Sequence, residues 1–100
     1  MSSKSKGTDF ERDVVIFLSE HNHFAVRCAG SKSKYFGGVV DVTAFDRTTK
    51  QWILIQSKLD GSISNTDKKA LILVAKECSA IPVLAYKSEG KIVLKKLQSL

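Results

Sequence analysis

Apolar residues recur at helical spacing near the start of the chain, and the pattern predicts a helix over about residues 9–20. A capping box precedes it, because the Thr8 hydroxyl and the Glu11 carboxylate can accept hydrogen bonds from free N–H groups of the first turn. Residues 1–7 are polar and basic, and we expect them to form a flexible arm. The apolar positions of this helix share one face, which is to be buried: Phe10, Val14, Phe17 and Leu18.

Further along the chain, short apolar or alternating stretches predict strands, and a second helix interrupts them. Asn65 or Thr66 can cap this helix, which is expected to end near Cys78. Residues 46–50 have the composition of a hairpin turn between the second and third strands. The predicted strands cover residues 24–28, 39–45, 52–58, 81–87 and 91–97.

The order helix, three strands, helix, two strands predicts one α/β domain over residues 8–100. We expect a single mixed five-stranded sheet flanked by helices, with one helix on each face. The helix between the third and fourth strands implies a right-handed crossover, so these two strands should be parallel neighbours.

Composition limits the class of protein. The chain has 100 residues, of which 43% are apolar, enough for one core without disulfides. It contains no apolar run of the roughly 20 residues that a membrane span needs, and its start lacks a signal peptide, so we expect a cytoplasmic protein, or one of the host cytoplasm if it is viral. Cys28 and Cys78 are too far apart for a zinc motif and are interpreted as reduced core residues. The net charge of +6 suits a polyanionic partner, although charge alone is weak evidence for nucleic acid.

Candidate chemistry lies where the second and third strands should meet. Asp41 interrupts an apolar strand, and a carboxylate there is costly unless it is paired, protonated or bound to a metal. In a hairpin, Asp41 would be level with Gln56 and Lys58, which strand alternation places on one face. Glu11 is the obvious second carboxylate. Oxygen ligands of this kind hold Mg²⁺, and a lysine can orient the attacking water or stabilise charge on a phosphate.

Each of these residues also has an ordinary structural interpretation. Glu11 could be only the capping-box partner of Thr8. Asp41 could pair with Arg27 or Arg47 at a strand end. Gln56 and Lys58 could form the solvated face of an edge strand, and His21 and His23 are interpreted as surface residues at a helix end. From the pattern alone, these alternatives stay open.

Several segments together resemble the successive motifs of a known family. They are Lys6-Gly7 and Glu11-Arg12, FAVRCAGSK at 24–32, VDVTA at 40–44, IQSK at 55–58 and IPVLAYK at 81–87. In this order they are similar to the archaeal Holliday junction resolvases of the PD-(D/E)xK nuclease superfamily. The resemblance implies a restriction-endonuclease-like fold and a homodimeric, Mg²⁺-dependent (or Mn²⁺-dependent) endodeoxyribonuclease of DNA recombination and repair. Such an enzyme would resolve four-way junctions by paired phosphodiester hydrolysis.

The resemblance also implies roles for individual residues. Glu11, Asp41 and Gln56 would be the metal ligands, Lys58 the catalytic lysine, and Ser31 would lie near the scissile phosphate. The expected contacts to DNA phosphates are basic residues: Lys6, Arg12, Arg27, Lys32 and Lys34.

Gln56 departs from the family, which usually has Glu at this place. An amide oxygen can ligate Mg²⁺ but brings no negative charge, so metal affinity should fall. The Q-x-K pattern also resembles Mrr-type endonucleases, and the loops at 35–38 and 59–65 differ from the expected form. Two further hypotheses follow: a Q-x-K nuclease that cuts duplex or modified DNA, and a catalytically inactive protein that binds junctions.

Overall fold

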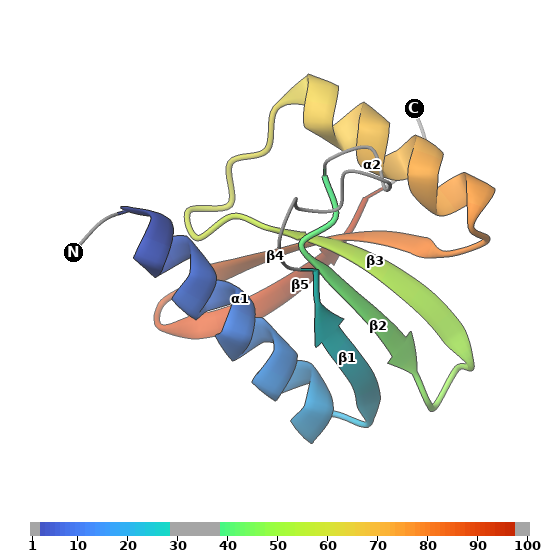
Figure 1. Ribbon diagram of the computed structural model, residues 1–100, viewed down its shortest axis with the longest axis horizontal. Helices are drawn as coiled ribbons and strands as arrows, with labels where there is room; N and C mark the ends of the chain where they lie inside the picture. Colours follow the sequence, from blue (N-terminus) through green and yellow to red (C-terminus); the bar gives the residue numbers. More distant parts are fainter. Residues whose placement is uncertain (1–2, 29–38, 98–100) are drawn as a thin grey trace.

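The structure is a computed structural model that describes residues 3–28 and 39–97, with the backbone alone for residues 3–8. Within these ranges the chain forms two helices and five strands (Figure 1). Their bounds are α1 Ser3–Glu20, β1 His23–Arg27, β2 Val42–Asp46, β3 Gln51–Ser57, α2 Asn65–Glu77, β4 Ile81–Ser88 and β5 Lys91–Lys96.

The strands form one mixed sheet in the order β1-β2-β3-β4-β5. Neighbouring strands are antiparallel except β3 and β4, which are parallel and joined through α2. This confirms the predicted α/β architecture and the crossover between the third and fourth strands. Helices α1 and α2 lie on opposite sides of the sheet (Figure 1).

Alternation along the central strand β3 divides the apolar residues into two cores. Ile53 and Ile55 pack with Phe10, Val14 and Leu18 of α1 on one face. On the other face Leu54 packs with Leu71 and Ala75 of α2. A strand buried on both faces is continuously apolar, which explains the run that marked β3 as central.

Three predicted boundaries were wrong. Helix α1 begins at Ser3, so helical backbone replaces the expected arm over residues 3–7, and the Thr8 capping box is not the start of the helix. The N-cap of α2 is Ser64, whose side chain accepts a hydrogen bond from the Asp67 N–H at 3.1 Å; neither Asn65 nor Thr66 holds this position.

Strand β2 starts at Val42, three residues later than predicted. Val39 and Val40 leave the strand direction because both are buried in the core cluster on the α2 side. The chain therefore bends at Asp41. No helix within the described part of the chain is long and apolar enough to cross a membrane.

Candidate active site

Asp41 lies at a bend of the chain, between the end of β1 and β3. Its backbone forms hydrogen bonds to Cys28, which follows β1, and to Ile55 of β3. Its C=O accepts a hydrogen bond from the Cys28 N–H, and its N–H donates to the Ile55 C=O, each at 2.8 Å. Its carboxylate accepts two hydrogen bonds from Ser57 at Oδ2, from the N–H at 2.8 Å and from the hydroxyl at 3.1 Å. Asp41 is thus held just before the start of β2. Within the described residues no hydrogen bond or ion pair joins it to Arg27 or Arg47, the partners that its structural interpretation would have required.

Glu11 points from α1 toward the end of β1. Its side chain is 11% exposed, and Oε1 accepts a hydrogen bond from Nη1 of Arg27 at 3.3 Å. A nearly buried carboxylate needs such a charged partner, because desolvation otherwise disfavours the ionised form. The guanidinium of Arg27 contacts Glu11, and the expected contact of Arg27 with a DNA phosphate stays a prediction.

Gln56 is the most unusual polar residue of the sheet. It is 6% exposed, in β3, on the same face as Leu54 by strand alternation. Its Oε1 is buried without a hydrogen-bond partner among the described residues. A residue on the solvated face of an edge strand would not be buried in this way. The interpretation of Gln56 as such a surface residue was therefore wrong. A buried carbonyl oxygen without a donor is costly unless something else supplies the partner.

Lys58 follows β3 directly and continues its pairing with β4. The Lys58 N–H donates to the Ala85 C=O at 2.9 Å, so the extended backbone reaches at least this residue. Alternation then places the Lys58 side chain on the face that carries Gln56. Lys58 is half-buried.

Hydrogen bonds along the strand ends link the segments that carry the four residues. Arg27, which holds Glu11, is followed by Cys28, whose N–H binds the Asp41 backbone. The Asp41 carboxylate binds Ser57, and Ser57 stands between Gln56 and Lys58. By alternation Gln56 and Lys58 lie on the α2 side of the sheet with Leu54, whereas Glu11 comes from α1 on the other side, and Asp41 lies at the bend between them.

The other predicted site residues are not gathered there by the described structure. Arg12 is exposed and lies 3.9 Å from Asp9, an exposed pair that contributes little to stability. The side chain of Lys6 and the whole of Ser31, Lys32 and Lys34 lie outside the described residues. The sequence analysis missed Ser57. The available signal was a polar residue at the end of a strand whose other positions on the same face, Ile53 and Ile55, are apolar.

The donor set fits a hard divalent cation. Such ions take oxygen ligands, and carboxylate and amide oxygens are all of that kind. The orphaned Oε1 of Gln56 is the observation that a bound cation would explain. Among the described residues, no three His, Cys, Asp or Glu side chains gather as a metal-binding group, which is expected when the third ligand is an amide.

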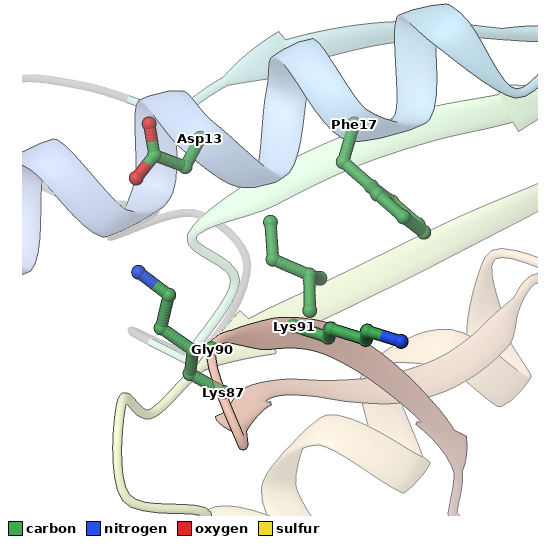
Figure 2. Close-up of a pocket in the computed structure, with 6 residues that line it drawn as sticks. Asp13, Phe17, Lys87, Gly90 and Lys91 are labelled. Carbon is green, nitrogen blue, oxygen red and sulfur yellow. The ribbon is translucent and has the colours of Figure 1, made fainter.

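A separate groove of about 460 Å³ lies between α1 and the β4–β5 hairpin. Figure 2 shows Phe17 and Asp13 on the helix side and Lys87, Gly90 and Lys91 on the hairpin side. None of the predicted catalytic residues lines this groove, so it is not the site of the predicted chemistry.

A mixed sheet with one helix on each face, and acidic and amide residues near the ends of β2 and β3, is the arrangement expected of nucleases of the PD-(D/E)xK class. The sequence profile of the archaeal Holliday junction resolvases (Hjc) matches residues 2–100, and the chain belongs to this family. The predicted family and its function, junction resolution by a metal-dependent endonuclease, are confirmed by this membership.

Among solved structures, the fold is similar to that of a Holliday junction resolvase from the archaeal hyperthermophile Archaeoglobus fulgidus. The TM-score is 0.73 at 23% identity, over 93% of this chain and 74% of the other. At this identity the likeness supports the fold, and it confirms the restriction-endonuclease-like architecture. No curated protein matches the chain significantly.

Proposed function

We propose that the protein uses Glu11, Asp41, Gln56 and Lys58 to hydrolyse phosphodiester bonds at four-way DNA junctions. The observation that carries this assignment is Oε1 of Gln56, which is buried without a hydrogen-bond partner in the described part of the chain and precedes Ser57, the residue that binds Asp41. The net charge of +6 favours approach to the DNA backbone.

Mg²⁺ is the proposed cation, with Mn²⁺ as a substitute, and Glu11, Asp41 and Gln56 would hold it. The ion would neutralise the scissile phosphate and lower the pKa of a water molecule. Lys58 would orient that water or stabilise the negative charge that develops on the phosphate. Arg27 binds the Glu11 carboxylate at 3.3 Å and would orient it, and Arg27 would also contact a DNA phosphate. Ser31, Lys6, Arg12, Lys32 and Lys34 would contact the DNA.

The replacement of a carboxylate by Gln56 should weaken metal binding without removing a ligand. An amide oxygen is a neutral donor, so one negative charge fewer faces the cation. We therefore expect a higher Mg²⁺ requirement than a carboxylate at this position would give. The Q-x-K pattern also favours a second candidate function, cleavage of linear duplex or modified DNA with the same residues, and a third in which junctions are bound but not cut.

Cleavage of labelled DNA with Mg²⁺ tests the proposal. Symmetric paired nicks in a four-way junction, with little cutting of the matching linear duplex, are expected. Lys58→Ala should lower kcat by at least about 100-fold while junction binding persists, because the lysine acts on the transition state. The exposed Lys69→Ala is the matched control and should cut normally. Equal activity of Lys58→Ala and the wild type would refute the assignment.

Comparable cutting of duplex and junction would support the second candidate. Tight junction binding without any cleavage would support the third, especially if Gln56→Glu restores activity.

We also propose that the enzyme is a homodimer, since two symmetric nicks need two sites. On the side of the sheet that faces α2, this helix packs mainly on β3 and β4. Beyond it, β1 exposes Phe24 and Val26, 61% and 63% exposed, and β3 exposes Trp52, 51% exposed. By alternation and register these residues share one face, and Phe45, which packs edge-on against Trp52, lies between them. This apolar surface, Phe24, Val26, Phe45 and Trp52, is where a second copy of the chain would bind.

A further inference from the structure

In the sequence Ser57 stands between Gln56 and Lys58, two of the proposed site residues. Its side chain binds a third, Asp41. Its N–H and its hydroxyl both donate to the same atom, Oδ2 of Asp41, at 2.8 and 3.1 Å. Within the described structure no hydrogen bond ends on Oδ1. We propose that Ser57 is a positioning residue that holds Oδ2 of Asp41 and leaves Oδ1 as the oxygen available to the cation. This inference rests on the proposed role of Asp41 as a metal ligand.

The strand geometry explains why the backbone contact exists. Lys58 donates its N–H to Ala85 of β4, so the preceding N–H, that of Ser57, points away from β4 toward β2. There the chain has already bent at Asp41, and Val39 and Val40 turn into the α2-side core. The Asp41 carboxylate therefore takes the place of a ladder carbonyl for the Ser57 N–H.

The hydroxyl contact is separate from this structural role. An alanine at position 57 keeps the N–H, so the end of β3 remains satisfied, but it removes the second hydrogen bond to Oδ2. A carboxylate held by two donors at one oxygen has fewer orientations than one held by a single donor. Partners that orient a metal-binding carboxylate typically raise metal affinity by about 10- to 100-fold. Within the described structure, the hydrogen bonds to the Asp41 carboxylate come from Ser57.

The test measures Mn²⁺ binding to the whole protein without DNA, from the electron paramagnetic resonance signal of free Mn²⁺. Ser57→Ala should bind Mn²⁺ roughly tenfold more weakly than the wild type. Ser57→Thr, which retains a hydroxyl and suits a strand, should restore wild-type binding. Ser62→Ala, in the exposed loop before α2, is the control and should bind as the wild type does. In cleavage assays Ser57→Ala should need more Mg²⁺ but approach the wild-type kcat at saturation.

The outcomes separate this inference from the proposed function. Wild-type Mn²⁺ affinity in Ser57→Ala, equal weakness of Ser57→Thr and Ser57→Ala, or no Mn²⁺ binding by the wild type would overturn it. A lowered melting temperature of Ser57→Ala with unchanged Mn²⁺ affinity would indicate a purely structural role and would overturn it as well. In each case the wild type could still cut junctions; failure of the wild type to cut any DNA would instead refute the proposed function.

Discussion

Gln56 combines two properties that rarely occur together, since it is buried at 6% exposure and its Oε1 has no partner within the described structure. Gln56→Glu would place a carboxylate there. Without metal the buried charge should lower stability by about 2–4 kcal/mol, or roughly 10–25 °C in melting temperature. With Mg²⁺ the same carboxylate becomes a charged ligand, so the melting temperature should recover and the Mg²⁺ requirement for cleavage should fall.

The measurement is thermal unfolding with EDTA and with increasing Mg²⁺. Gln56→Leu is the matched control, because it has a similar volume without the orphaned acceptor. It should be as stable as the wild type or more so, and should gain nothing from Mg²⁺. If Gln56→Glu is no more responsive to Mg²⁺ than Gln56→Leu, position 56 does not face the cation.

The residue types of the site were predictable, but their contacts were not. Asp41 was proposed because a carboxylate is out of place in an apolar strand, and Gln56 and Lys58 because strand alternation places them on one face, level with Asp41. Which residues contact one another depends on the bend at Asp41. The sequence does not indicate this bend, because Val39 and Val40 are apolar and fit the pattern of a strand. For this reason the contact of Ser57 with Asp41 and that of Arg27 with Glu11 were missed.

At the scale of elements, the β2–β3 hairpin carries a charge that makes its stability depend on pH. Asp46 accepts hydrogen bonds from the Thr48 and Thr49 N–H groups at 2.9 and 3.3 Å, and it lies 3.7 Å from His23. Burial raises the pKa of Asp46, but these hydrogen bonds and His23 outweigh that effect, and the pKa falls below its ordinary value of 3.8. Folding therefore favours the ionised carboxylate.

The resulting stability is complete above about pH 4 and is lost as the pH falls through the lowered pKa of the folded state. Asp46→Asn can still accept the turn hydrogen bonds but carries no charge. We expect the wild type to melt at a higher temperature than Asp46→Asn at pH 6, with the difference shrinking toward pH 2. Melting curves across this range measure it. A difference that is constant down to pH 2 would contradict the role of the charge.

Element boundaries were less predictable than element types. Apolar periodicity located both helices and all five strands, because each must bury one or two faces. It could not locate the start of α1, since helical backbone extends over the polar residues 3–8, where no apolar position marks it. The cap of α2 was displaced by one residue because Ser64, Asn65 and Thr66 are all suitable caps.

For the whole molecule, the sequence order specified the sheet topology, because a helix between two strands requires a parallel crossover. The exposed face was not evident, since Phe24, Val26 and Trp52 have the same apolar character as core residues. Only the position of α2, which covers β3 and β4, shows that they are left uncovered. Arg47 lies 4.5 Å above the Phe24 ring and forms one polar border of this surface.

If this apolar surface binds a second copy, a charge placed on it should separate the copies. Trp52→Lys should be a monomer at concentrations where the wild type is a dimer, because an unpaired ammonium would be buried between the subunits. Ile16→Lys is the matched control: Ile16 is 55% exposed on α1, which packs on the other face of the sheet, and this variant should remain dimeric. Sedimentation velocity gives the mass of each.

Since paired nicking needs two joined sites, Trp52→Lys should also cut the two strands of a junction independently, leaving singly nicked junctions that the wild type does not accumulate. A dimeric Trp52→Lys, or a monomeric wild type that still makes paired nicks, would contradict this assignment of the surface.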